Sequence, residues 1–173
     1  SVGSGGAIPS GSHRFFMRQF NLVFTTVWDD LFARAAQDMK RDVQLVEMGE
    51  IIPQPSSKRP VLVRLRGGFS TSPIITRSDE AAHEWAADGR RRIRELIRKN
   101  VVLFVGFRPD EEEFEVLFDR LTEAYGASLP RCHLAVAQGQ IDDYQWQRWV
   151  WRGLLLFTAD PEDCTEALQA AIG

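Results

Sequence analysis

The stretch Phe20-Asn21-Leu22-Val23-Phe24-Thr25-Thr26-Val27-Trp28-Asp29-Asp30-Leu31-Phe32 predicts a buried strand, a sharp turn and the start of a helix. An apolar, β-prone run ends in two threonines, and two aspartates follow where a helix would begin. Beyond them, apolar residues recur at helical spacing as far as Ala36. In open α/β sheets, ligands bind at the carboxyl ends of the strands. This junction is therefore the first candidate position for a ligand-binding site.

The rest of the chain continues the alternation of strands and helices. Apolar runs predict strands at residues 43–48, 61–65, 74–76, 101–105, 133–137 and 154–157. Amphipathic patterns predict helices at residues 28–40, 79–99, after Asp110, 141–151 and 161–172. The run at 101–105 is apolar at every position, as central parallel strands are, and Gly106 is expected to end it. The pattern predicts an α/β fold, a Rossmann-like, mostly parallel sheet with helices on both faces.

The composition is that of one globular domain. The chain has 173 residues, of which 44% are hydrophobic and 26% are charged. Residues 1–12 are rich in Gly and Ser, so we expect residues 1–18 to form an arm or linker and residues 19–173 to form a single domain. Two widely separated cysteines without a C-x-x-C pattern argue against a structural zinc and a disulfide framework. The three histidines share no spacing with acids or cysteines, so no metal site is expected.

Charge and hydropathy exclude several kinds of partner. The formal net charge of −3 gives no general electrostatic reason to bind nucleic acid or an anionic membrane. No apolar run reaches the about 18 residues that span a bilayer, and residues 1–12 lack the pattern of a signal peptide. The basic run at residues 90–99 includes Ile93, Leu96 and Ile97, which favours a solvated helix face over a nucleic-acid patch. We therefore expect a cytoplasmic protein without nucleic-acid or membrane partners.

Several segments resemble, in the same order, the sirtuin-like NAD-binding domains of bacterial defence and signalling proteins. Residues 20–36 resemble that family's strand, its Thr-Thr-Asn-Tyr-Asp turn and the helix that follows. Residues 61–67 resemble its Leu-His-Gly strand, and residues 102–110 resemble its Val-Gly-Tyr-Ser strand and loop. Residues 153–168 resemble its closing strand and helix. The likeness covers the chain from residue 20 onward and implies a sirtuin-like version of the Rossmann-like fold.

The resemblance also defines the chemistry to expect, and the chain departs from it. Active members of the family cleave NAD to nicotinamide and ADP-ribose or use it for deacylation, with the Asn positioning ribose and water and the His acting as base. Here Val27 stands at the Asn position and Arg66 at the His position. Valine has no polar group, and arginine stays protonated at physiological pH. Because general-base catalysis contributes about 10²–10⁴-fold, we expect no catalytic residues.

The family's ligand-binding positions carry over to seven residues of this chain. They are Thr25, Thr26, Trp28, Asp29, Arg66, Gly106 and Phe107. Each also has a purely structural reading. The threonines suit a strand end, Asp29 suits a helix cap, and the Gly106–Phe107 pair suits a strand end beside the core. Arg66 is either an anchor for a phosphate or the ion-pair partner of Asp29 or Asp30.

The family's domain begins with a strand and a Gly-Ala-Gly-x-Ser loop that receives the NAD pyrophosphate. Residues 3–9 are faintly similar to that loop, but no apolar strand precedes them, so a linker is the better reading. We therefore expect the sheet to lack a normally central strand, with the gap either closed or filled from elsewhere.

These observations favour a non-catalytic, sirtuin-like interaction or sensor module in a bacterial defence or signalling system. The alternatives are an NAD-cleaving effector and a sensor that binds NAD or ADP-ribose without cleaving it. No cofactor is assigned, and NAD and ADP-ribose stay open as ligands. Trp146, Trp149 and Trp151 cannot all face one core stripe, so we expect a protein partner or a homo-oligomer.

Overall fold

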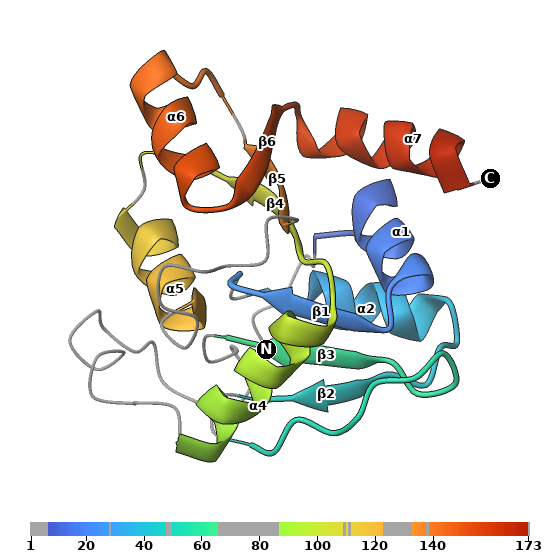
Figure 1. Ribbon diagram of the computed structural model, residues 1–173. Coiled ribbons are helices and arrows are strands. Elements are labelled where there is room, and N and C mark those ends of the chain that lie inside the picture. The colour runs from blue at the N-terminus through green and yellow to red at the C-terminus, as the bar shows by residue number, and fades with distance from the viewer. Residues whose placement is uncertain are drawn as a thin grey trace, which may run out of the picture. The chain divides into compact units, whose positions relative to one another are not determined.

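The computed structural model describes residues 7–27, 29–47, 50–65, 87–108, 110, 112–122, 133–137 and 139–172. The chain divides into two compact units, Ser1–Gly89 and Arg90–Gly173, which we call unit 1 and unit 2 and describe separately. Each unit contains a sheet of parallel strands together with helices (Figure 1). The predicted α/β fold is thereby confirmed. No helix in the described part of the chain is long and apolar enough to cross a membrane.

Unit 1 is built on a parallel sheet of three strands in the order β1-β3-β2. Its elements are α1 (Gly11–Gln19), β1 (Leu22–Thr25), α2 (Leu31–Asp38), β2 (Gln44–Val46) and β3 (Val61–Arg64). Leu22 of β1 and Gln44 of β2 both pair with Val61 of the central strand. All residues of β3 are buried, as the continuous apolar run predicts for a strand covered on both faces.

Helix α1 corrects the prediction that residues 1–18 form an arm. Residues 11–18 belong to a helix whose Phe15 and Met17 are buried. Met17 packs in one cluster with Ala35 and Ala36 of α2 and Leu62 of β3. The Gly- and Ser-rich residues before the helix concealed this short apolar pattern. A nine-residue helix is marginal by itself, so its burial against α2 and β3 is what stabilises it.

We expect Met17→Ala to lower the free energy of unfolding by about 2–3 kcal/mol, because it empties a fully buried position. The matched control is Arg18→Ala, which changes the next residue on the exposed side of the same helix and should stay within about 0.5 kcal/mol of wild type. Urea unfolding followed by circular dichroism measures both. If the two variants are equally stable, α1 does not contribute to the packed core of unit 1, and the predicted arm is the better description.

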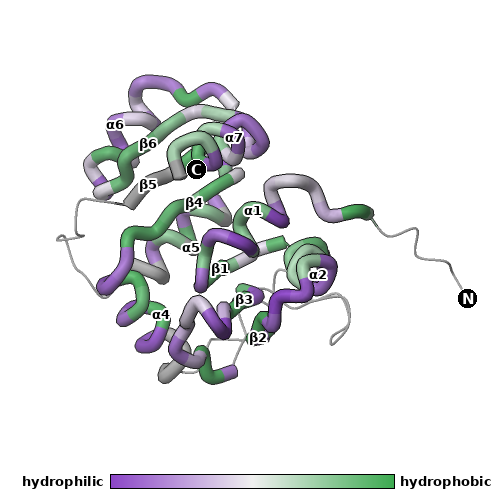
Figure 2. The backbone as a smooth tube through the Cα atoms, turned by 90° about the vertical axis from the view of Figure 1, so that its right-hand side faces the viewer, coloured by the Kyte–Doolittle hydropathy of each residue, from purple (hydrophilic) through white to green (hydrophobic). Residues whose placement is uncertain are grey.

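Unit 2 contains a second parallel sheet, in the order β4-β5-β6. Helix α4 (Ala87–Lys99) precedes this sheet in the chain. Hydrophobic residues of α4 are interspersed among hydrophilic ones (Figure 2). The sheet and its helices are β4 (Leu103–Phe107), α5 (Glu112–Thr122), β5 (His133–Ala137), α6 (Asp143–Trp151), β6 (Leu154–Thr158) and α7 (Pro161–Ile172). On α4, Ile93, Leu96 and Ile97 are buried, which confirms the predicted core face.

Strand β4 lies two residues further along the chain than predicted. Val101 is exposed, and Gly106 does not end the strand. The backbone passes through Gly106 as a bulge, with a register shift between Val105 and Phe107. Gly106 has a φ of +78°, a left-handed conformation that glycine adopts without a steric penalty. The bulge lets Phe107 continue the ladder opposite Ala137.

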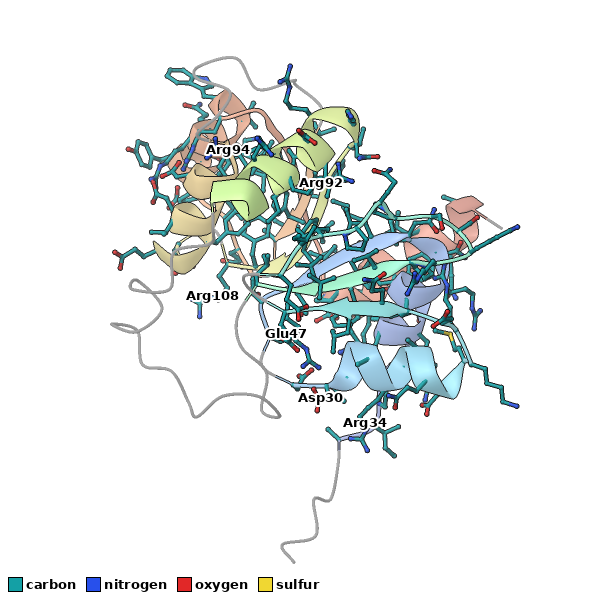
Figure 3. The ribbon with its side chains drawn as sticks, turned by 90° about the horizontal axis from the view of Figure 1, so that it is seen from below. Asp30, Arg34, Glu47, Arg92, Arg94 and Arg108 are labelled. Atoms are coloured by element: carbon teal, nitrogen blue, oxygen red, sulfur yellow. The ribbon has the colours of Figure 1, made fainter. Side chains whose placement is uncertain are left out.

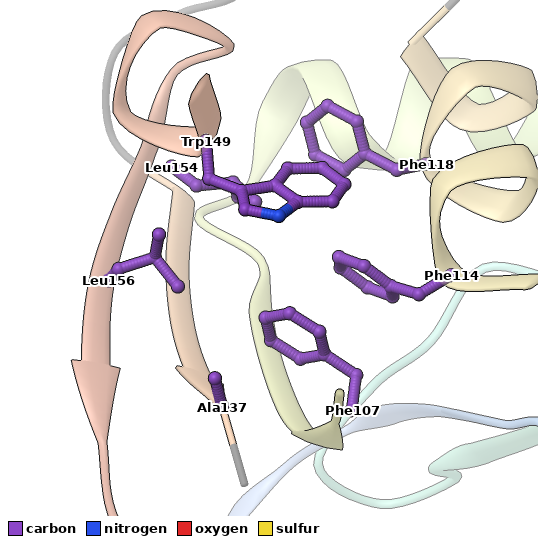
Figure 4. Close-up of a cluster of buried hydrophobic side chains, with 7 residues drawn as sticks. All are labelled: Phe107, Phe114, Phe118, Ala137, Trp149, Leu154 and Leu156. Atoms are coloured by element: carbon purple, nitrogen blue, oxygen red, sulfur yellow. The ribbon is translucent and has the colours of Figure 1, made fainter. Parts of the chain in front are cut away.

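The core of unit 2 is largely aromatic (Figure 4). Phe107 stacks on Phe114 with ring centroids 3.8 Å apart, and Trp149 meets Phe118 edge-on at 5.4 Å. The guanidinium of Arg152 lies 4.7 Å from the centre of the Trp149 ring, within cation–π range. Leu154 and Leu156 complete the cluster from β6. Sheet, α5 and α6 are thus joined by one packed layer.

Candidate ligand-binding site

The turn after β1 is held by two bonds between side chains and backbone. Thr25 is buried, and its Oγ1 accepts a hydrogen bond from the backbone N–H of Val27 at 3.3 Å. Asp29 Oδ1 accepts from the backbone N–H of Leu31 at 3.1 Å, which satisfies a donor in the first turn of α2. Thr26 and Val27 are exposed. The structure therefore brings three predicted site residues, Thr25, Thr26 and Asp29, together between β1 and α2.

A buried arginine lies beside this turn. Arg64, the last residue of the central strand, is only 2% exposed. Its Nη2 donates to Asp30, which follows the turn, and its Nη1 donates to Glu47 Oε1 at 3.0 Å. Asp30 and Glu47 lie close together beside the strands of unit 1 (Figure 3). One guanidinium thus connects the carboxyl ends of three adjacent strands.

The arginine cluster of Arg64, Asp30 and Glu47 is not fully satisfied by the described residues. Within that part of the chain, Arg64 Nε and Glu47 Oε2 are buried without a hydrogen-bond partner. Two carboxylates face one guanidinium, so the cluster carries a formal charge of −1. Buried charges are costly unless they are paired, so this arrangement couples the positions of all three side chains.

The sequence interpretation missed Arg64 and Glu47. It offered Arg66 as the partner of Asp30, whereas Arg64 holds that carboxylate. Arg66 and Trp28 lie outside the described residues. A signal was present, because a lone arginine inside the apolar run Val61–Leu65 needs a buried partner.

His13 of α1 lies within electrostatic reach of the turn. Its Nδ1 accepts from the backbone N–H of Ser10 at 3.2 Å, and its ring packs against Phe32 with centroids 4.7 Å apart. Burial lowers the pKa of His13 below its ordinary value; the charge of Asp29 opposes this shift and that of Arg14 adds to it. The fold therefore favours the neutral imidazole.

We expect this preference to make stability depend on pH. The pKa of His13 is lower in the folded state than in the unfolded chain, so the unfolded state binds more protons below about pH 6.5. The contribution of His13 to the free energy of unfolding is fully present above that pH. It is lost as the pH falls through the folded-state pKa. His13→Gln keeps an acceptor that suits the third helical position but does not titrate. Urea unfolding between pH 7.5 and pH 5 should show a shallower decline for the variant; parallel curves would exclude His13 as the source.

Unit 2 has a polar concavity at the carboxyl ends of β4 and β5, which we call the β4–β5 hollow. Its volume is about 680 Å³, and it is lined by Arg108, Asp110, Gly139, Gln140, Ile141, Asp142 and Gln145. Residues 108–110 follow β4, and residues 139–145 connect β5 to α6 and form its first turn. The volume lies within the range of small-molecule sites. Its position at the carboxyl ends of parallel strands makes it a candidate site for a polar ligand.

Polar groups in the hollow are arranged by local structure. Arg108 and Asp110 form an exposed ion pair of 3.1 Å. Asp142 caps α6 by accepting from the backbone N–H of Gln145 at 2.7 Å. Of the predicted ligand residues, Gly106 is exposed just before the hollow, while Phe107 is buried in the aromatic core. The lining residues themselves were missed, because two loops far apart in sequence form the hollow.

The described residues contain no group of three His, Cys, Asp or Glu side chains placed to hold a metal ion. Parallel strands with polar turns at their carboxyl ends define a Rossmann-type α/β protein. The family model of the SIR2-like domain matches residues 21–154, which is most of the chain. The chain therefore belongs to the SIR2-like domain family, and the predicted sirtuin-like resemblance is confirmed. A comparison with curated proteins gave no significant match.

Proposed function

We propose that this SIR2-like domain is non-catalytic and acts as a sensor or interaction module in a bacterial defence or signalling system. The observation that carries the proposal is Val27. It occupies the middle of the turn, where the resemblance places the family's catalytic asparagine. Thr25 and Asp29 hold the backbone on either side of it. An isopropyl group at this position offers neither a donor nor an acceptor to a ribose or a water.

The polar neighbours of Val27 are already engaged in hydrogen bonds that hold the local structure. Thr25 Oγ1 accepts from the backbone N–H of Val27, and Asp29 Oδ1 accepts from the backbone N–H of Leu31. Asp30 accepts from Arg64. A group that activates water needs to be within hydrogen-bond reach of it in a suitable protonation state. Arg66, at the family's histidine position, is protonated at physiological pH and does not act as a base. These features support the absence of catalysis.

The β4–β5 hollow favours a sensor over a domain that only binds other proteins. It combines a cation, two carboxylates and amide groups in a space of about 680 Å³. Arg108 suits a phosphate, because guanidinium and phosphate form bidentate, charge-assisted hydrogen bonds. A phosphate would replace Asp110 as the partner of Arg108, and their exposed ion pair costs little to open. NAD and ADP-ribose both carry a pyrophosphate, so they are the ligands to test first. Binding without cleavage is the behaviour that we expect.

The test is calorimetric titration with NAD and with ADP-ribose, with nicotinamide release followed in the NAD sample. We expect heat without nicotinamide. Arg108→Ala should weaken binding about tenfold or more, as expected for the loss of a charge-assisted contact, whereas Arg18→Ala, on the exposed side of α1, should not. Nicotinamide release that Asp29→Asn abolishes would overturn the proposal and support an NAD-cleaving effector. If the titrations give no heat and no nicotinamide is released, the sensor role is excluded and the interaction role is left.

A further inference from the structure

The charges in the β4–β5 hollow differ from those of a general phosphate site. Among the described residues that line the hollow, the charged ones are Arg108, Asp110 and Asp142. All three are exposed, and together they give the hollow a formal charge of −1. A site that attracts polyphosphates collects an excess of positive charge. The hollow therefore has one group that attracts a phosphate and two that repel it.

The amino end of α6 does not supply the missing positive charge. A helix N-terminus attracts anions, because its first N–H groups carry a partial positive charge. Here Asp142 caps the helix by accepting from the backbone N–H of Gln145, and Asp143 lies in the first turn. Carboxylates of the chain thus already compensate the positive end of α6. Among the described lining residues, Arg108 is the group left to attract a phosphate.

A phosphate bound to Arg108 stays close to Asp110. The guanidinium Nη2 of Arg108 and Oδ2 of Asp110 are 3.1 Å apart, and the two residues are separated by one position in the chain. A phosphate that takes the place of Asp110 lies within a few ångströms of the displaced carboxylate, because both anions approach the same guanidinium. Two like charges about 4 Å apart in water repel enough to change an affinity about fivefold. Each further negative charge on the phosphates therefore weakens binding.

We propose that Asp110 and Asp142 make the hollow select pyrophosphates that are esterified at both ends over nucleotides that end in a free phosphate. This inference rests on the proposed sensor role. ADP-ribose is ADP whose terminal phosphate carries a ribose ester, and the ester removes a negative charge. NAD is esterified in the same way, whereas ADP and ATP keep a free terminal phosphate. Unfavourable charges placed against a competitor are a common source of specificity. The two carboxylates thus reject nucleotides that share their adenosine part with the proposed ligands.

Calorimetric titration with ADP-ribose, ADP and ATP is the test, with EDTA present so that no divalent cation masks the phosphate charge. Wild type should bind ADP-ribose at least about threefold more tightly than ADP, and ATP should bind more weakly than ADP. Asp110→Asn and Asp142→Asn in one chain should bring the affinities for ADP and ADP-ribose to within about twofold of each other. Both changes keep the size of the side chain, and asparagine also caps helices. Circular dichroism checks that the double variant folds.

The matched control is Asp42→Asn, which removes the same charge from an exposed position that does not line the hollow. It should leave the ratio of the two affinities unchanged. Ionic strength gives a second measurement, because the Debye length falls from about 10 Å at 0.1 M salt to about 3 Å at 1 M. The preference of the wild type for ADP-ribose should shrink over this range.

Two results overturn the proposal while leaving the sensor role in place. One is a wild type that binds ADP as tightly as ADP-ribose. The other is a preference for ADP-ribose that persists both in the double variant and at high salt, which would mean that the ribose itself is recognised. If none of the three nucleotides binds and NAD does not bind either, the sensor role fails, and this inference fails with it.

Discussion

Replacing Asp30 with asparagine and Glu47 with glutamine in one chain is expected to lower the free energy of unfolding by about 3 kcal/mol. Both changes keep the size of the side chain and remove its charge. Arg64 would then be a cation at 2% exposure without an anion among its described partners. Losing the partners of a buried charge typically costs about 3–5 kcal/mol. The lower end applies here because Asp30 is itself half-exposed.

A third substitution tests whether the unpaired charge of Arg64, and not a loss of packing, causes the destabilisation. Adding Arg64→Met to the double variant should restore most of the lost stability, because an apolar chain of similar length leaves no unpaired charge. The control is Asp38→Asn, which removes the exposed partner of Arg14 at 3.5 Å and should cost no more than about 1 kcal/mol. Urea unfolding measures the series. A triple variant less stable than the double one would contradict this account of the arginine cluster.

Trp149→Ala should destabilise unit 2 by about 3–5 kcal/mol, the usual cost of truncating a buried aromatic side chain. The indole is completely buried and touches the rings of Phe107, Phe114 and Phe118. Its removal also takes away the aromatic surface against which Arg152 lies. Intrinsic fluorescence and circular dichroism during urea unfolding should report the same shift of the midpoint.

The matched control is Trp151→Ala, which makes the same change two residues further along α6. Because Trp151 is 87% exposed, its removal should alter stability by about 0.5 kcal/mol or less. Similar losses for the two tryptophans would mean that the core of unit 2 is not centred on Trp149.

Much of the fold could be predicted from periodicity alone. Strand β5 and helix α7 have the predicted bounds, because apolar runs and flanking turn residues mark both ends. Strand β4 was misplaced by two residues, since a glycine with positive φ continues a strand through a bulge, and an apolar pattern does not distinguish a bulge from an end. Helix α1 was missed because burial against distant residues, and not local propensity, stabilises it.

The candidate site was predicted less completely. The rule that ligands bind at carboxyl strand ends located the turn at Thr25–Asp29, where the structure forms an ordered arrangement. The same rule applies to the β4–β5 hollow, but no sequence pattern shows which side chains from residues 108–110 and 139–145 face one another. Arg64 could have been found from its unusual place in an apolar strand, whereas its partners required the strand order.

The arginine cluster also constrains how this domain can change over generations. Its three members come from separate segments of the chain, so no single mutation replaces them together. A lineage that loses one carboxylate has a less stable protein until a change at position 64 restores the stability. We therefore expect residues 30, 47 and 64 to be inherited as a set among close relatives, with charged and apolar sets rarely mixed. The side chain of Val27 takes part in no ion pair, so position 27 is free to vary independently of other positions.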